Sequence, residues 1–319
     1  MRRAVYWATT PLRALRVFAM ADFDRHSTAE GVTAGLDLTG QTVLVTGATS
    51  GVGLEAARVL ALRGAHVLVA GRTLEKAREA SAVIPGRATP LACELEDFDA
   101  VAECAARVNQ LGVPLDALIC NAGIMAPPRL ELVRGLEKQF VVNHLGHFLL
   151  VSRLLDAVRA APAGRVVMVS SSAHKWAPPG GIAFSNLTGE KGYDPRVFYG
   201  QSKLANALVA RELARRLAGT RVTANAVHPG LIITNIIRYI PRWQQLLAPL
   251  VGPLLRSRIK TSAQGAATTC YVAVHPGVTG VSGRYFADCA VAVPEKVMED
   301  DELAARLWTE SESLVRSWL

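Results

Sequence analysis

The sequence lacks the features that define a secreted, metal-binding or membrane-spanning protein. Its five cysteines are odd in number and include no Cys-x-x-Cys pair, which argues against a disulfide framework and against a zinc site. No window reaches the roughly 18 consecutive apolar residues of a membrane-spanning helix. No basic module interleaved with aromatic residues is present, so no nucleic-acid partner is expected. These absences favour a reducing, intracellular setting, and we expect no metal.

Acidic residues are missing from two segments of a chain whose net charge is +8. Residues 1–21 carry four arginines, and residues 238–260 carry four arginines and Lys260. A solvated face explains each cluster, but both are interleaved with Leu, Ile, Val and Trp, which also suits contact with an anionic membrane surface. The start, Met1 to Met20, lacks the unbroken apolar core and cleavage site of a signal peptide. We therefore expect a cytoplasmic protein, soluble or peripherally attached to a membrane.

From Thr42 onward, short Val/Leu/Ile-rich runs alternate with longer helical patterns. The runs predict strands at Thr42–Thr46, His66–Ala70, Ala88–Ala92, Leu115–Cys120, Arg165–Val169 and Val222–Val227. The stretches between them predict helices at Leu54–Arg63, Leu74–Ala82, Asp97–Leu111, Leu136–Arg159 and Lys203–Leu217. Continuous apolarity indicates strands buried on both faces. We predict an α/β fold with a doubly wound, Rossmann-type parallel sheet and helices on both faces.

The alternation of apolar runs and helical patterns ends after His228-Pro229-Gly230. Residues 231–261 are apolar, basic and broken by prolines, which indicates a helical substrate flap over the carboxyl edge of the sheet. A helix (Ser262–Val274), a short strand (Arg284–Ala287) and an acidic helix (Glu302–Trp318) are predicted to follow. We thus divide the chain into an N-terminal extension, residues 1–38, and a single domain, residues 39–319.

The segment from Thr46 to Gly53 follows the first predicted strand and opens the first helix. Glycines there let a pyrophosphate approach the backbone at a helix N-terminus. Alone, the segment is equally consistent with an ordinary glycine-rich turn, and its place between strand and helix favours a cofactor site. The predicted contacts are Gly47, Thr49, Ser50, Gly51, Val52 and Gly53.

Arg72 stands at the end of the second predicted strand, where a dinucleotide fold reads the adenosine ribose. A guanidinium suits a 2′-phosphate, so Arg72 favours NADP(H) over NAD(H). The alternative is a surface arginine without a ligand.

Tyr199 and Lys203 are four residues apart, a spacing that places both on one face of a helix. An ammonium beside a phenol favours the phenolate, which makes the tyrosine a candidate acid/base. Lowering its pKa from near 10 to near neutral takes roughly 3 units, or about 4 kcal/mol. One lysine does not supply that alone, so a second positive charge is expected, and an oxidised nicotinamide ring would provide it.

Taken together, these motifs resemble the short-chain dehydrogenase/reductase family. The pattern TGxxxGxG, Asn121-Ala122-Gly123, a serine ending the fifth strand, YxxxK and Pro229-Gly230 with Thr234 occurs in the family's order over residues 42 to 234. Other segments resemble the retinol-dehydrogenase-like and WW-domain-oxidoreductase-like members more narrowly. These are residues 143–148 (NHLGHF), 171–174 (SSAH), 202–206 (SKLAN), 264–268 (QGAAT) and 283–286 (GRYF).

The resemblance implies a catalytic role for four residues. Tyr199 would exchange a proton with the substrate oxygen, and Lys203 would lower the tyrosine pKa and hold the nicotinamide ribose. Ser171 would hydrogen-bond the substrate, and Asn143 would anchor a water that relays protons through Lys203. Strand alternation points Ser171 one way and Ser170 and Ser172 the other, and the family's register selects Ser171.

The resemblance also implies the remaining cofactor contacts. Glu94 and Leu95 stand where the family usually has an aspartate that contacts the adenine. The other implied contacts are on the adenosine side (Asn121, Ala122, Gly123) and at the carboxamide (Pro229, Gly230, Ile232, Thr234).

We therefore expect an NADP(H)-dependent enzyme that interconverts an alcohol and a carbonyl. The Leu, Ile, Trp243 and Pro content of the flap suits a lipophilic substrate of retinoid, steroid, prenyl or polyketide type. The family's dimers and tetramers imply a homo-oligomer. The alternative is an NADP-binding regulatory protein with little turnover. A Ser–His hydrolase is not expected, because no Gly-x-Ser-x-Gly elbow precedes a helix.

Overall fold

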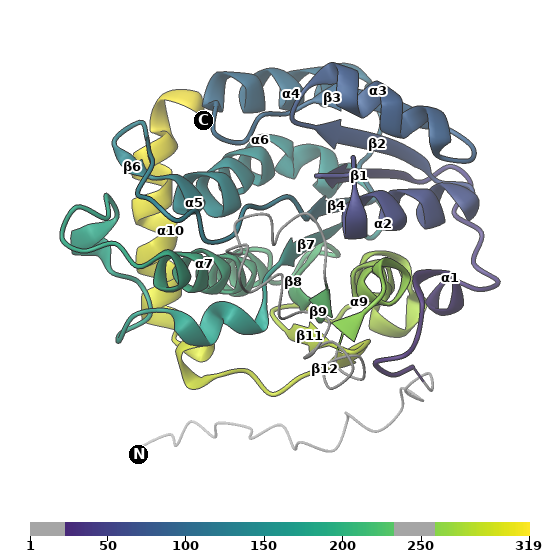
Figure 1. The fold of residues 1–319 in the computed structure, drawn as a ribbon. Coiled ribbons are helices and arrows are strands. Elements are labelled where there is room, and N and C mark those ends of the chain that lie inside the picture. The colour runs from purple at the N-terminus through teal and green to yellow at the C-terminus, as the bar shows by residue number, and fades with distance from the viewer. Residues whose placement is uncertain (1–22, 233–258) are drawn as a thin grey trace, which may run out of the picture.

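The computed structural model describes residues 23–232 and 259–319. Within them, eight strands form one sheet in the order β12-β11-β8-β7-β4-β1-β2-β3 (Figure 1). The strands are β1 (Thr42–Thr46), β2 (His66–Gly71), β3 (Ala88–Ala92), β4 (Ala117–Cys120), β7 (Arg165–Val169), β8 (Thr223–His228), β11 (Tyr285–Ala287) and β12 (Ala290–Val291). Neighbouring strands are parallel except β12, which runs antiparallel to β11.

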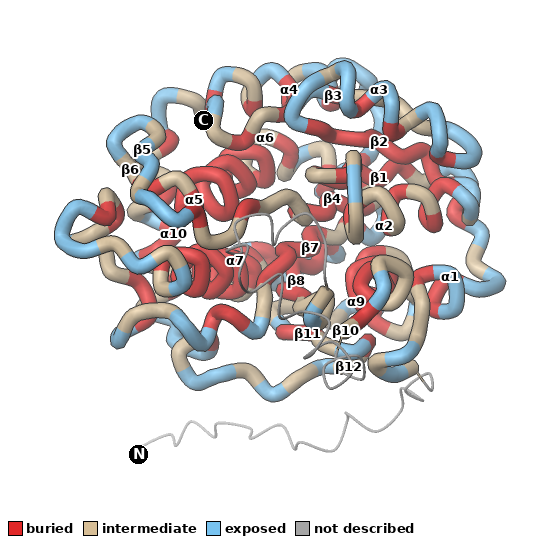
Figure 2. The backbone as a smooth tube through the Cα atoms, viewed as in Figure 1, coloured by how far each residue is buried: buried red, intermediate tan, exposed pale blue. Residues whose placement is uncertain are grey.

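Helices cover both faces of the sheet. One face carries α4 (Phe98–Gln110), α6 (Gly146–Ala160), α7 (Pro195–Arg216) and α10 (Asp301–Val315). The other carries α1 (Ala29–Val32), α2 (Gly51–Leu62), α3 (Leu74–Val83) and α9 (Ser262–Val274). Each face has its own apolar core, and Figure 2 shows the buried backbone concentrated in the strands and in helices such as α7 and α9. The predicted doubly wound α/β fold is confirmed.

Two predicted helices differ from the structure. The stretch Leu136–Arg159 is not one helix: β6 (Leu136–Glu137), paired with β5 (Leu132–Val133), and the short α5 (Lys138–Phe140) lead into a π-helical turn, Val141–Leu145, before α6 begins. The helix predicted from Lys203 already begins at Pro195. Asp194 caps it by accepting from the N–H groups of Arg196 and Val197, a start signal followed by proline at the first helical position. Tyr199 and Lys203 therefore lie inside one helix.

Most of the predicted flap, from residue 233 to 258, lies outside the described residues, as do residues 1–22 of the predicted extension. The two ends of the flap lie side by side, because β9 (Leu231–Ile232) pairs in parallel with β10 (Ile259–Lys260). Residues 23–38 pack on the domain: α1 contacts α2 and α9, and Phe23 makes edge-to-face contact with Tyr271 of α9. Among the described helices, none has the length and apolar character to cross a bilayer.

Candidate active site

A cavity of about 800 Å³ opens at the carboxyl ends of the central strands. In open α/β sheets this edge is where ligands bind. The loops after β1, β2, β3, β4, β7 and β8 all contribute to its lining. Segments far apart in the sequence are thus brought to one site by the order of the strands.

The loop after β1 forms a cradle that only glycine permits. Gly47 has φ +64°, and a Cβ on it would lie 2.8 Å from the Ala122 Cα. A Cβ on Gly53 would lie 2.4 Å from both the Asn121 Nδ2 and the Gly47 carbonyl oxygen. Ser50 is the N-cap of α2, yet its side chain makes no capping hydrogen bond. The first N–H groups of α2 therefore have no side-chain cap at the cavity, a setting that suits a phosphate group.

Arg72 lines the cavity beyond this loop, together with Lys76 of α3. Its Nε lies 3.1 Å from a carboxylate oxygen of Glu94, which follows β3. Burial raises the pKa of Glu94, while the charge of Arg72 opposes that rise. Arg72 is half exposed, so this ion pair is worth only about 0–1 kcal/mol. Because this ion pair is weak, Arg72 remains available to bind an anionic ligand.

Tyr199, Ser171 and Lys203 all line the cavity. The Ser171 hydroxyl lies near the Tyr199 phenol and lowers its pKa, and it also accepts from the Ala173 N–H at 3.1 Å. The Lys203 ammonium lies 5.8 Å from the centre of the Tyr199 ring and donates to the Val169 carbonyl at 3.1 Å. Ser170 also lines the cavity, but its hydroxyl donates to the Lys203 carbonyl at 2.7 Å.

Burial dominates the electrostatics of this group. It raises the pKa of Tyr199 to about 12, and the Ser171 hydrogen bond offsets the rise only in part. The same burial lowers the pKa of Lys203 to about 8. The chain's own groups thus disfavour both charged forms. The lowering of the Tyr199 pKa expected from Lys203 does not appear, and the second positive charge stays a prediction.

Asn143 lies behind the cavity rather than in its wall, in the π-helical turn. Its side chain is fully engaged: Oδ1 accepts from the Ile124 N–H at 2.8 Å, and Nδ2 donates to the Ile124 carbonyl at 3.0 Å and to the Ser202 hydroxyl at 2.9 Å. Gly123 separates it from Lys203, since a Cβ there would lie 3.1 Å from the Asn143 Oδ1 and 3.3 Å from the Lys203 Nζ. The backbone carbonyl of Asn143 accepts from the His147 ring at 2.9 Å and has a second lone pair, so the water relay stays a prediction.

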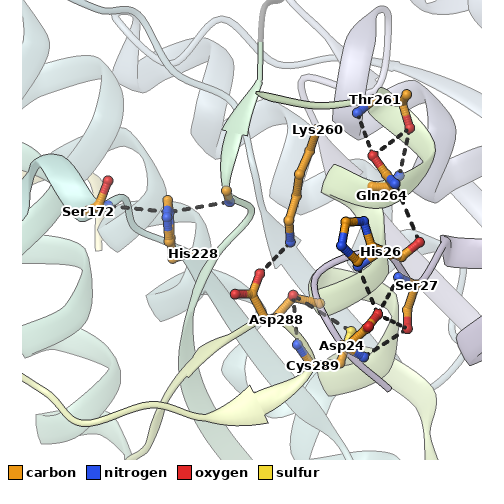
Figure 3. A network of polar contacts seen from close by, with 12 residues as sticks. Asp24, His26, Ser27, Ser172, His228, Lys260, Thr261, Gln264, Asp288 and Cys289 are labelled. Carbon is orange, nitrogen blue, oxygen red and sulfur yellow. Dashed lines mark hydrogen bonds and ion pairs between the residues drawn. The ribbon is translucent and has the colours of Figure 1, made fainter. Parts of the chain in front are cut away.

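His228, at the end of β8, connects two walls of the cavity (Figure 3). Its Nδ1 accepts from the backbone N–H of Ser172 at 3.3 Å and of Gly230 at 3.4 Å. Burial lowers the pKa of His228 to about 4, so the ring is neutral near pH 7 and able to accept. It ties the loop that carries Ser171 to the loop that carries Pro229 and Gly230.

Comparisons with known proteins agree with this geometry. A family model described as short chain dehydrogenase matches residues 41–186. The chain is 42% identical to the chloroplastic short-chain dehydrogenase TIC 32 B of Brassica napus, over 91% of this chain and 93% of the relative. It is 38% identical to human retinol dehydrogenase 14, over 86% of each. A solved structure from Beutenbergia cavernae, described as a candidate NAD(P)-dependent gluconate 5-dehydrogenase with NADP bound at low occupancy, is 28% identical, has a TM-score of 0.63 and covers 79% of this chain and 96% of that one.

The chain belongs to the short-chain dehydrogenase/reductase family. It is accordingly an NAD(P)-dependent oxidoreductase that acts on CH–OH groups, and the narrower likeness to retinol dehydrogenases is confirmed.

The structure brings together most of the residues that the family motifs select. The cavity is lined by the predicted Gly47, Thr49, Ser50, Gly51, Val52, Gly53, Arg72, Glu94, Leu95, Asn121, Ala122, Gly123, Ser171, Tyr199, Lys203, Pro229, Gly230 and Ile232. Asn143 is not in that wall, and Thr234 lies outside the described residues.

Sequence reasoning missed three residues of the short-chain dehydrogenase/reductase site. Lys76 lines the cavity one turn into α3, Trp176 stands at its edge with 43% of its surface exposed, and His228 bridges two of its walls. Lys76 and His228 could have been found from the sequence, since each lies within four residues of a predicted cofactor contact. Trp176 had none, because its ring reaches Tyr199 only through the tertiary fold, at 6.5 Å between ring centres.

Proposed function

We propose that this protein interconverts an alcohol and a ketone or aldehyde on a lipophilic small molecule with NADP(H). The observation that carries the proposal is that Tyr199, Ser171 and Lys203 line the same cavity as the glycine cradle. A proton-transfer group and a phosphate-binding loop in one hollow are what such a reaction needs.

The proton chemistry falls to Tyr199. With its pKa raised to about 12, the phenol is protonated near pH 7 and can donate to a carbonyl oxygen in the reductive direction. The Ser171 hydroxyl, which lies near the same phenol, would hold that oxygen in place. When bound, the reduced nicotinamide would supply the hydride in this direction, and in the oxidative direction the oxidised ring would accept it and add the second positive charge. Lys203, buried beside the tyrosine ring, would hold the ribose.

The preference for NADP(H) rests on Arg72 and Lys76. Both are cations at the edge of the cavity near the end of β2, where the ribose is read. Glu94 opposes a phosphate there, but it contacts Arg72 through Nε, one of five N–H donors of the guanidinium. A hydrogen bond to a charged group is worth about 1.5–3 kcal/mol, more than the exposed ion pair that it would compete with.

Apolar side chains support a lipophilic substrate of retinoid, steroid, prenyl or polyketide type. Trp176 and Leu231 are 43% and 56% exposed beside the cavity, and Met125 joins them in its lining. Large exposed apolar side chains at a pocket are typical of sites that bind apolar ligands. Human retinol dehydrogenase 14, a relative of this chain, has a lipophilic compound in its name.

Two variants test the function. Tyr199→Phe keeps the ring packing and removes the acid, so NADPH binding should persist while turnover of a panel of lipophilic carbonyls and alcohols falls by a factor of about 10²–10⁴. Undiminished turnover would refute the proposed role of Tyr199. A biological role that survives the substitution with NADPH still bound would favour the NADP-binding regulatory protein.

The cofactor preference is tested at Arg72. Arg72→Ala should raise the KM for NADPH about 10- to 100-fold and leave that for NADH nearly unchanged. Glu94→Gln should lower the KM for NADPH, because it removes the competing carboxylate. Equal effects of Arg72→Ala on both cofactors would refute the preference.

We also propose that residues 1–21 make peripheral contact with anionic membranes, on the basis of their four arginines and apolar content. Deletion of those residues should abolish flotation with phosphatidylserine vesicles and leave turnover intact. Flotation that persists after the deletion would contradict this attachment.

A further inference from the structure

The NHLGHF segment contains a histidine, His147, for which the reaction above has no use. It is the second residue of α6, is fully buried and lies outside the cavity wall. Both of its ring nitrogens are engaged. Nδ1 lies 2.9 Å from the Asn143 carbonyl oxygen, and Nε2 lies 2.8 Å from the Thr46 hydroxyl.

The chemistry of the partners determines the direction of these hydrogen bonds. The Asn143 carbonyl can only accept, so Nδ1 carries the proton. A neutral imidazole has one such proton, which makes Nε2 an acceptor and the Thr46 hydroxyl its donor. Burial lowers the pKa of His147 to about 4, with Lys203 as a further cause, so the ring is neutral near pH 7.

The same threonine organises the cofactor side of the cavity. Its hydroxyl accepts from the backbone N–H groups of Asn121 at 2.9 Å and Ala122 at 3.0 Å. Its single proton is directed to the His147 Nε2 at 2.8 Å, with the Ile119 carbonyl as a second, longer acceptor at 3.4 Å, so all of its hydrogen-bonding capacity is committed. One polar chain thus runs from the Asn121-Ala122 backbone through Thr46 and His147 to the Asn143 carbonyl.

The local backbone is arranged to bring His147 to this position. A Cβ on Gly146 would lie 2.5 Å from the Leu95 carbonyl oxygen, so glycine lets α6 begin directly against the loop after β3. The π-helical turn just before it holds Asn143, and π-helical turns occur frequently at functional sites. Asn143, Gly146 and His147 of the segment therefore each have a specific contact.

We propose that His147 is a positioning residue that links the glycine-rich cofactor loop to the Asn143 carbonyl and thereby holds the catalytic end of the cavity in register with the cofactor end. The proposal rests on the roles given above to Asn143 and to the loop after β1. It predicts that the two bonds of the ring serve two separable functions, cofactor binding through Thr46 and turnover through Asn143.

Paired substitutions separate the two bonds. An asparagine amide lies near the position of Nδ1, and a glutamine amide near that of Nε2. His147→Asn keeps the donor to Asn143 and loses the Thr46 bond, so the dissociation constant for NADPH should rise about tenfold or more with kcat nearly unchanged. His147→Gln keeps the Thr46 bond and loses the donor, so kcat should fall about tenfold or more and its pH profile should shift, with NADPH binding nearly unchanged.

His66→Gln is the matched control. His66 is also a buried histidine bound to a threonine, Thr89, at 2.8 Å, but it lies at the amino end of β2, away from the cavity. Its substitution should lower the melting temperature and change neither constant. Parallel losses of kcat and NADPH binding in both His147 variants, or no loss in either, would overturn the proposal.

A measurement on the wild-type holoenzyme covers the case in which a His147 variant does not fold. ¹⁵N NMR of the protein with ¹⁵N-labelled histidine should show the His147 ring with Nδ1 protonated and Nε2 unprotonated from pH 6 to 9. The opposite tautomer would overturn the proposal. Failure of the proposed function is distinct, because it would appear as undiminished turnover in Tyr199→Phe.

Discussion

The ion pair between Lys260 and Asp288 gives a sharp prediction about how the cavity wall is supported (Figure 3). The Lys260 side chain is only 6% exposed, whereas that of Asp288 is 52% exposed. The Lys260 stem packs against Gly230, which has φ +96° and on which a Cβ would lie 2.6 Å from the Lys260 Cδ. We expect the two single substitutions to have unequal effects because the two charges are unequally buried.

Asp288→Asn leaves an ammonium buried without its counter-charge. Breaking a buried pair costs about 3–5 kcal/mol, but Asp288 is half exposed and partly screened, so we expect a loss of about 1–3 kcal/mol. Asparagine suits the position, since Asp288 has φ +51° and Asn tolerates that conformation. Lys260→Met keeps an unbranched stem over Gly230 and leaves a solvated carboxylate, so its loss should be under about 1 kcal/mol.

Urea unfolding of the two single variants and the double variant measures these values. The double variant should resemble Lys260→Met, because no ammonium is left for the lost carboxylate to neutralise. The coupling energy then equals the loss in Asp288→Asn, about 1–3 kcal/mol. The KM for NADPH should rise more in Asp288→Asn than in Lys260→Met, since Gly230 and Pro229 line the cavity. Equal losses in the two single variants, or a coupling near zero, would refute the reasoning.

Three other predictions follow from the site. Lys203→Met should abolish turnover yet raise the free energy of unfolding by up to about 3 kcal/mol near pH 7. The reason is that the wild type buries a charged ammonium, whose folded pKa of about 8 lies below its unfolded value. The stability of the wild type should rise between pH 8 and the unfolded lysine pKa, so the stability advantage of Lys203→Met over the wild type should shrink over that range. Urea unfolding as a function of pH measures this, with Lys191→Met, at an exposed lysine, as a control that should show no such pH dependence. An advantage that stays constant with pH would contradict the prediction. Gly200→Ala should lower both kcat and the melting temperature. The new Cβ would lie 2.7 Å from the Ala173 carbonyl oxygen, so the helix would have to shift and carry Tyr199 away from Ser171. An unchanged kcat would contradict this prediction. Trp176→Ala should raise the KM for bulky apolar substrates and leave NADPH binding intact, which substrate titration and NADPH titration would measure. An equal loss of substrate affinity and NADPH affinity would count against a role of Trp176 in substrate binding.

The fold could be predicted because its signals are local and repeated. The β1, β3 and β7 strands match their predicted bounds. For β1 and β7 the reason is a continuous apolar run buried on both faces of the sheet, whereas β3 is a partly buried edge strand. The predicted helix Leu136–Arg159 was wrong because its hydrophobic period cannot reveal a β-hairpin or a π-helical turn. That turn accommodates the contacts of Asn143 with Ile124 and Ser202, which lie 19 and 59 residues away in the chain.

The candidate site divides in the same way. Sequence by itself determined the chemistry at hand: a glycine loop that only glycine can form, an arginine at the ribose end, and a tyrosine and lysine one helical turn apart. Ser170, Ser171 and Ser172 all line the cavity, and the packing of α7 on the β7 strand separates their roles. The buried Ser170 hydroxyl donates to the Lys203 carbonyl, which leaves Ser171 as the serine near Tyr199. The charges followed tertiary structure too, since burial, which no motif encodes, sets the pKa of Tyr199 and of Lys203. Long-range links such as Thr46 to His147 required the folded chain, because hydrogen bonds between residues 101 positions apart leave no local pattern.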